Sequence, residues 1–133
     1  MKTQKTNDAD HGAQPALNHA MLDAYAKRRT GLLERLINAY LDEAPRFHQL
    51  IRQGMDNDDL SLVKLNAHAL KSSSHNLGAT RLSKLCQEIE LAADQSQPSL
   101  IGELVERLGP QCFEVEEGLK TVLLQEKAKT VAV

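Results

Sequence analysis

A histidine and a lysine three residues apart, His68 and Lys71, are the residues of this chain best suited to chemistry. They open the segment HALKSSSHNLGA at residues 68–79. A neutral imidazole is a competent nucleophile, because its reference pKa of about 6.5 leaves much of it unprotonated at cellular pH. An ammonium group one helical turn away can neutralise the oxygen charge of a phosphoryl group. The pair therefore indicates phosphoryl chemistry.

The residues around His68 have the periodicity of an amphipathic helix. At about 100° per residue, the polar residues within about 60° of His68 are Ser61, Lys64, Lys71, Ser72 and His75. The apolar residues Leu62, Val63, Leu70 and Leu77 lie near the opposite pole. Asn66 and Ser73 are polar exceptions on the apolar side, where a small hydroxyl can bond the carbonyl one turn earlier or permit close approach of another helix. The helix is therefore expected to present His68 to water.

Length and composition indicate one globular domain without a special environment. The chain has 133 residues, of which 41% are hydrophobic and 26% charged. Its net charge of −2 gives no general attraction to nucleic acid or to an anionic membrane surface. Its two cysteines form no Cys-x-x-Cys pair, no apolar run is long enough for a membrane span, and no signal peptide is visible. We therefore expect a cytoplasmic protein without nucleic-acid or direct membrane contact.

Three segments are expected along the chain: a disordered leader or linker at 1–14, a domain at 15–127 and a frayed tail at 128–133. A short first helix should end before the basic residues that begin at Lys27. Thr30 can cap a long second helix, which Pro45 should interrupt and bend. The acidic turn at 56–59 can cap the His68 helix, and Gly78 should end it.

Two more helices complete the expected fold. The fourth should start near Thr80 and bury one face, which includes Cys86. Pro98 suits the first turn of the fifth, which should kink or break at Gly109-Pro110. No segment alternates as a strand would. The sequence therefore predicts an all-α fold, an antiparallel four-helix bundle with an extra short N-terminal helix.

The motif around His68 resembles that of the histidine phosphotransfer (HPt) domain of bacterial multistep phosphorelays. The family pattern runs approximately His-x-Leu-Lys-Gly-Ser-x-x-x-Leu-Gly-Ala. The matching residues here are His68, Leu70, Lys71, Ser73, Leu77, Gly78 and Ala79. The segments YLDEAP at 40–45 and LSKLCQEIE at 82–90 also look like the second and fourth helices of the family. The chain departs from the pattern at Ser72, which stands where the family most often has glycine.

The resemblance implies a phosphotransfer protein of a two-component system. It implies that His68 accepts a phosphoryl group from a receiver-domain aspartate and passes it to another receiver aspartate. The partners would be receiver domains and a hybrid sensor histidine kinase, and the receiver would supply Mg²⁺. The chain would need no cofactor of its own and would be a monomer. A free-standing protein and the C-terminal HPt domain of a hybrid kinase both fit the sequence.

The expected site has a centre and a periphery. His68 is the phosphoacceptor and Lys71 the residue that stabilises phosphoryl charge; Ser72, Ser73, Lys64 and Gly78 are expected to support them. The residues expected to contact a docked receiver are Ser61, Lys64, Ser72, His75 and Ala79. The glycines do not form a Gly-x-x-x-x-Gly-Lys-Ser/Thr loop, so the chain should not be a kinase with its own ATP site.

Two other functions compete with phosphotransfer. Helical bundles can hold metal or haem, and the chain has five histidines. However, His68 and His75 are two turns apart, roughly 10 Å along the axis, which is too far to share one ion. The second alternative is a helical module that only docks and transfers no phosphate. The presence of both His68 and Lys71 favours transfer.

Overall fold

The structure is a computed structural model that describes residues 15–132, and these residues form helices and turns without strands. The expected leader at 1–14 lies outside the described residues. The helices are α2 (His19–Arg28), α3 (Leu32–Asp56), α4 (Leu60–Asn76), α5 (Thr80–Asp94) and α6 (Pro98–Ala132). The predicted all-α fold is confirmed.

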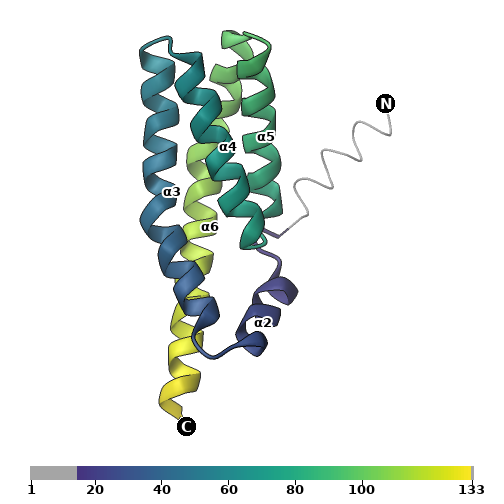
Figure 1. The fold of residues 1–133 in the computed structure, drawn as a ribbon, viewed down its shortest axis with the longest axis vertical. Coiled ribbons are helices and arrows are strands. Elements are labelled where there is room, and N and C mark those ends of the chain that lie inside the picture. Colours follow the sequence, from purple (N-terminus) through teal and green to yellow (C-terminus); the bar gives the residue numbers. More distant parts are fainter. Residues whose placement is uncertain (1–14, 133) are drawn as a thin grey trace, which may run out of the picture.

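Four long helices form an up-and-down bundle, and α2 packs beside one end of it (Figure 1). α3 and α5 each pack against both α4 and α6. Consequently α4 and α6 occupy opposite corners of the bundle. The short connections between successive helices account for the antiparallel order, because they leave no length for a crossover.

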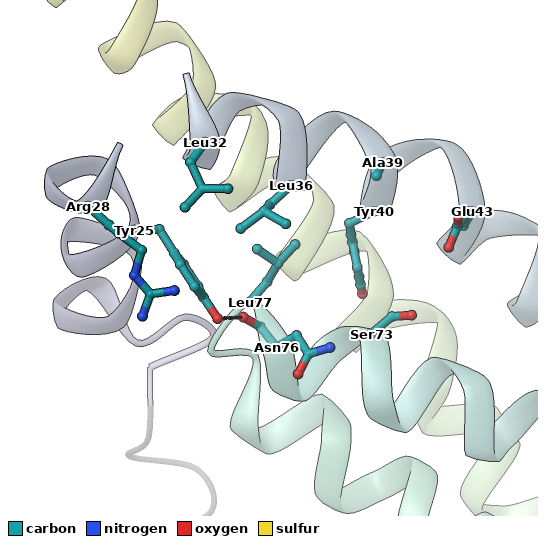
Figure 2. A pocket seen from close by; sticks show the side chains of 10 residues that line it. All are labelled: Tyr25, Arg28, Leu32, Leu36, Ala39, Tyr40, Glu43, Ser73, Asn76 and Leu77. Carbon is teal, nitrogen blue, oxygen red and sulfur yellow. Dashed lines mark hydrogen bonds between the residues drawn. The ribbon is translucent and has the colours of Figure 1, made fainter. Parts of the chain in front are cut away.

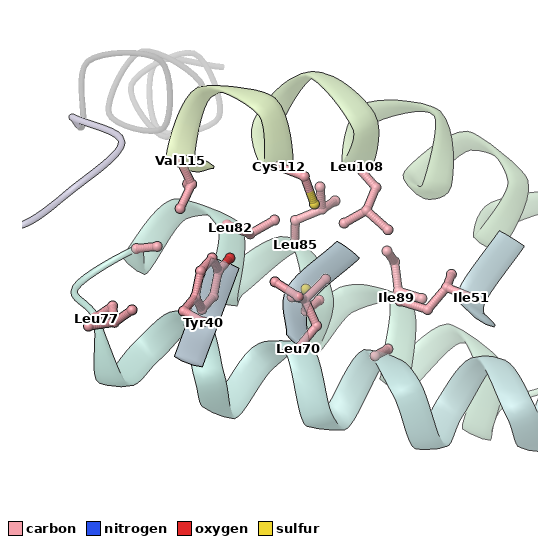
Figure 3. Close-up of a cluster of buried hydrophobic side chains, with 14 of the residues drawn as sticks. Tyr40, Ile51, Leu70, Leu77, Leu82, Leu85, Ile89, Leu108, Cys112 and Val115 are labelled. Carbon is pink, nitrogen blue, oxygen red and sulfur yellow. The ribbon is translucent and has the colours of Figure 1, made fainter. Parts of the chain in front are cut away.

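The core runs along the bundle axis and receives side chains from all four long helices (Figure 3). Its largest fully buried aliphatic side chains are Leu22, Ile37, Ile51, Leu70, Leu82, Ile89, Ile101, Leu108 and Leu119. The apolar face predicted for the fourth helix is confirmed, since Leu82, Leu85, Cys86, Ile89 and Ala93 are all buried.

The helix α2 ends later than predicted. The Asn18 side chain accepts a hydrogen bond from the Met21 amide at 3.1 Å and caps its start. The helix continues through Lys27 and Arg28, so the prediction that it ends before this basic cluster is wrong. Basic side chains are favourable in a last turn, because they lie near the negative end of the helix dipole.

The N-cap of α3 lies one residue after the predicted cap. The residue at the N-cap is Gly31, with a φ of +79°, and no side chain caps this end. Thr30 therefore lies one residue too early to act as the cap. A positive φ is readily adopted by glycine, which explains why the chain turns there.

Both internal prolines lie within continuous helices, so the interruption predicted at Pro45 and the break considered at Gly109-Pro110 are wrong, whereas a bend or kink at these prolines stays a prediction. α3 continues through Pro45 and α6 through Pro110. A proline removes one backbone hydrogen bond. The buried residues on either side, Ala44 and Ile51 in α3 and Leu108 and Cys112 in α6, hold both halves of each helix in the core. Packing outweighs the lost bond.

The last helix extends past the predicted C-terminal boundary of the domain. α6 is helical to Ala132, beyond the boundary expected at residue 127. Its C-terminal part projects past the end of α3 in Figure 1. Within the described residues, no helix has the length and apolar content needed to cross a membrane.

Candidate functional site

The helix that carries His68 is fixed at both ends by its own sequence. At its start, the Asp59 side chain accepts a hydrogen bond from the Leu62 amide at 3.0 Å, which confirms the predicted cap. At its end, Gly78 has a φ of +75°, and the Ala79 amide donates to the Ser74 carbonyl at 2.9 Å. This is the Schellman ending, and it confirms the prediction for Gly78.

Two buried polar residues on the inner side of α4 have partners. The Asn66 side-chain amide donates to the Leu62 carbonyl one turn earlier at 2.9 Å. The Ser74 hydroxyl lies 3.2 Å from the hydroxyl of Tyr40 on α3. Burial raises the pKa of Tyr40, so its hydroxyl stays protonated. The contact between Tyr40 and Ser74 joins α3 to α4, so it helps to fix the rotation of α4 about its axis and the direction in which His68 points.

His68 lies on the surface, with its side chain 59% exposed, and is held by a carboxylate from the neighbouring helix. Its Nδ1 is 2.8 Å from Oε2 of Glu90 on α5. The other carboxylate oxygen of Glu90, Oε1, accepts a hydrogen bond from Lys71 Nζ at 2.8 Å. Glu90 therefore joins the two residues that the sequence singled out.

The charge state of Glu90 follows from these two contacts. Partial burial works to raise the pKa of its carboxyl, but the hydrogen bonds and positive charge of Lys71 and His68 outweigh it. The pKa of Glu90 is therefore below its usual range. An ionised carboxylate can only accept hydrogen bonds, so Nδ1 of His68 must carry the proton that is shared with it. In the neutral form of the ring, the lone pair is then on Nε2, on the far side of the ring.

A second ion pair lies one turn before His68. Lys64 Nζ is 2.6 Å from Oδ1 of Asp94, which is near the C-terminus of α5. The hydrogen bond and the charge of Asp94 raise the pKa of Lys64. A shallow hollow of about 320 Å³ separates the two ion pairs; it is lined by Lys64, Lys71, Gln87, Glu90, Leu91 and Asp94.

The remaining predicted residues divide between the two sides of α4. Ser61, Ser72 and His75 are exposed, on the side of the helix that carries His68. Ser73 is half-buried and lines a groove between α2, α3 and α4, together with Tyr25 (Figure 2). Ser73 therefore lies away from His68, and the prediction that it supports the site is wrong, because it is five residues and about 140° further around the helix.

The predictions for Gly78 and Ala79 need correction. Gly78 is ten residues from His68, roughly 15 Å along the helix, so it cannot support the chemistry directly. It makes room for the chain before α2, because a Cβ there would lie 2.9 Å from Cβ of Asn18. Ala79 is fully buried and cannot line a docking surface. It occupies the N-cap of α5, where the turn encloses it.

The sequence did not identify three residues that the fold brings to the site. Glu90 is 22 residues after His68 on another helix, so no spacing within α4 could reveal it. Leu65 on α4 and Leu91 on α5 are 67% and 55% exposed, which is unusual for leucine. The predicted docking residues are polar or small residues on or next to α4, so this prediction includes neither leucine.

Comparison with known proteins is consistent with this geometry. Residues 35–125 match the family of the Hpt domain. No curated protein sequence matches the chain. Residues 35–125 contain α4 and α5 entirely and most of α3 and α6, so the match covers His68, Lys71 and Glu90.

Three solved structures share the fold. Histidine-containing phosphotransfer protein B (HptB) from Pseudomonas aeruginosa PAO1 superposes with a TM-score of 0.80 at 18% identity, over 85% of this chain and 98% of that one. The HPT domain of the Hpt sensor hybrid histidine kinase from Shewanella gives 0.72 at 24% identity, over 83% and 95%. A putative histidine-containing phosphotransfer protein from rice gives 0.75 at 15% identity, over 96% and 94%.

At these identities the likeness to solved structures establishes the helical bundle alone. The family match covers more than half of the chain and includes the exposed histidine, Glu90 and Lys71. The chain belongs to the Hpt domain family, whose members are histidine phosphotransfer intermediaries of phosphorelays.

Proposed function

We propose that Nε2 of His68 accepts a phosphoryl group from a receiver-domain aspartate and passes it to the aspartate of another receiver. The observation that carries this proposal is the contact between Nδ1 of His68 and the Glu90 carboxylate at 2.8 Å. It holds the proton on Nδ1 and leaves Nε2 as the nucleophilic nitrogen on an exposed ring.

The transfer step balances without a separate base. The Nε2 lone pair attacks phosphorus, an N–P bond forms and the P–O bond to the aspartate breaks, which returns that side chain as a carboxylate. Because Nε2 carries no proton beforehand, none has to leave. The ring keeps its Nδ1 proton and becomes cationic while it faces the Glu90 carboxylate. Glu90 therefore orients the ring and stabilises the charge that it acquires.

Lys71 is positioned to neutralise the phosphoryl oxygens. Its Nζ is 2.8 Å from Oε1 of Glu90, and Glu90 also contacts His68. Because the lysine side chain is flexible, a short rotation would bring Nζ to a phosphoryl group on Nε2. Lys64 is held by Asp94 and adds positive charge further along the helix. Phosphoryl transfer needs mainly placement and charge neutralisation, which these residues supply.

We place the divalent cation on the partner. Receiver domains are expected to bring Mg²⁺ with the aspartate, and the chain would need no cofactor of its own. A hybrid sensor kinase is expected to start the relay, with kinase activity belonging to this chain only if it is part of such a protein. The cytoplasm is the compartment in which these partners would be met.

The surface around His68 suits a partner with an apolar contact patch. Leu65 lies one turn before His68, and Leu91 adjoins Glu90 at the edge of the hollow. A receiver domain that brings its aspartate within bonding distance of Nε2 would cover this area. Ser61, Ser72 and His75 would complete the contact, with Ser72 small enough for a close approach. We therefore expect the two leucines to contribute to docking by burial of apolar area.

The test is incubation of the purified chain with a phosphorylated receiver. We expect label on the chain that acid removes and base does not. The His68→Gln variant should fold and remain unlabelled. The matched control is His75→Gln, which changes another exposed histidine of the same helix and should be labelled normally. Persistent labelling of His68→Gln would move the site elsewhere, and an unlabelled wild type would favour the module that only docks.

A second experiment separates docking from chemistry. Phosphoramidate is a small phosphodonor that needs no docking surface. The Leu65→Ser/Leu91→Ser variant should keep its labelling by phosphoramidate but lose roughly 5- to 30-fold in kcat/KM with a receiver. Leu124→Ser is the control, because Leu124 on α6 is as exposed as Leu65. An unchanged kcat/KM in the double variant would refute the role of the two leucines.

A further inference from the structure

The outward face of α6 carries two exposed apolar side chains. Phe113 is 65% exposed and Leu124 is 67% exposed. They are eleven residues apart, which is three turns plus about 20°, so both side chains point in nearly the same direction. The buried residues Leu108, Cys112 and Val115 of the same helix point into the bundle (Figure 3). Phe113 and Leu124 therefore have no role in the core.

An opposite pair of charges lies between these two side chains on the same face. Lys120 Nζ is 3.1 Å from Oε2 of Glu117, and more than half of each side chain is exposed. Phe113, Glu117, Lys120 and Leu124 all fall within about 60° of one another around the helix. We call these four residues the α6 face.

The α6 face is symmetric about its own centre. Phe113 and Leu124 are equally far from the midpoint between Gly118 and Leu119, about 8 Å along the axis on either side. Glu117 and Lys120 are equally far from the same point, about 2 Å on either side. A two-fold rotation about a line through this point brings each residue opposite its complement.

We propose that the α6 face binds the α6 face of a second copy of this chain, with the two helices antiparallel. Phe113 of each copy would then contact Leu124 of the other, at both ends of the contact. At the centre, Glu117 of each copy would lie opposite Lys120 of the other, so that four charges alternate in sign. Such a contact is isologous, which is the commonest symmetry of soluble dimers.

Charge complementarity identifies a second copy as the occupant. A parallel arrangement would place Glu117 opposite Glu117 and Lys120 opposite Lys120, which repel each other. The antiparallel arrangement instead joins the two intrachain pairs into one cluster of four charges, which is flanked by apolar contacts. The proposal replaces the expectation of a monomer that the sequence suggested.

The dimer would leave the proposed phosphotransfer site free. α4 and α6 occupy opposite corners of the bundle, since each packs against α3 and α5. His68 therefore faces away from the α6 face, and both copies could be phosphorylated. The contact contains few residues and is smaller than a standard interface, so we expect self-association at protein concentrations on the order of 0.1–1 mM.

Sedimentation equilibrium of the full chain tests the proposal through charge reversal. The wild type should self-associate, whereas Glu117→Lys and Lys120→Glu should each be monomeric over the same concentrations. The first variant carries only positive charges at the centre of the face, and the second only negative ones. An equimolar mixture of the two should associate again. The double variant Glu117→Lys/Lys120→Glu is the control, because it restores alternating signs within one chain.

Two further measurements define the contact. Phe113→Ser should weaken association at least about fivefold, and 1 M salt should weaken it through screening of the central charges. A wild type that stays monomeric at about 1 mM would overturn the proposal. So would single variants that associate as tightly as the wild type, or a mixture that stays monomeric. None of these outcomes depends on whether His68 is phosphorylated.

Discussion

The contact between His68 and Glu90 permits a prediction whose size follows from the structure. The perturbation is Glu90→Ala, which removes the acceptor 2.8 Å from Nδ1. A hydrogen bond to a charged group contributes about 1.5–3 kcal/mol, and the exposure of His68 reduces this to about 1 kcal/mol by solvent screening. One kcal/mol is a factor of about five in an equilibrium constant. The ratio of the Nδ1–H to the Nε2–H tautomer should therefore fall about fivefold.

The ring nitrogens of His68 report this ratio directly. Their ¹⁵N chemical shifts distinguish protonated from unprotonated nitrogen, and at about pH 8.5 an imidazole is neutral. In a Lys71→Met background, where no ammonium competes for the acceptor, Glu90→Gln is the matched control, because the amide oxygen of glutamine can still accept from Nδ1. We expect the control to retain the tautomer of the wild type. An unchanged ratio in Glu90→Ala would refute the assignment of Nε2 as the nucleophile.

The effect of Glu90 on the transfer rate is measured in a variant background in which Lys71 does not contribute. Glu90→Ala also releases Lys71, whose Nζ is 2.8 Å from the carboxylate, and a freed ammonium could speed transfer. The comparison of Lys71→Met with Lys71→Met/Glu90→Ala removes that effect. In this background the rate from a phosphorylated receiver should fall by up to about fivefold, which is the largest change that a fivefold fall in the ratio can make in the population of the reactive tautomer. Equal rates would show that Glu90 acts only through Lys71.

Three further predictions concern stability, each measured by urea unfolding. Because the pKa of Glu90 is lowered in the folded state, its contribution is present above the unfolded pKa of about 4.3 and is lost as pH falls through the folded value. The difference in stability between wild type and Glu90→Gln should therefore shrink below about pH 4. Gly78→Ala should cost about 1–3 kcal/mol because of its positive φ and the nearby Asn18, whereas Gly102→Ala, at an open helical position, should stabilise by roughly 0.5–1 kcal/mol. Tyr40→Phe should cost about 1 kcal/mol, since it removes a buried hydrogen bond to a serine; no change would refute that contact.

Some features of the fold follow from local sequence, because their causes lie within a few residues. The Asp59 cap, the turn at Gly78 and the start of α6 at Pro98 were all predicted correctly. The interruption predicted at Pro45 and the break considered at Gly109-Pro110 are wrong for the converse reason. Whether a helix survives the loss of one backbone bond depends on what its two halves bury, and this is set by other helices.

The site likewise combines features that follow from local sequence with features that only the packing of the helices decides. Helical periodicity alone put His68 and Lys71 on one exposed side of a helix, and the resemblance of the motif gave the class of chemistry. Only the antiparallel packing of α5 on α4 decided that Glu90 contacts both of them. That pairing sets which ring nitrogen is free, and it joins residues 22 positions apart across a turn. Periodicity describes one helix at a time, whereas the state of the imidazole depends on the side chain that a second helix brings to it.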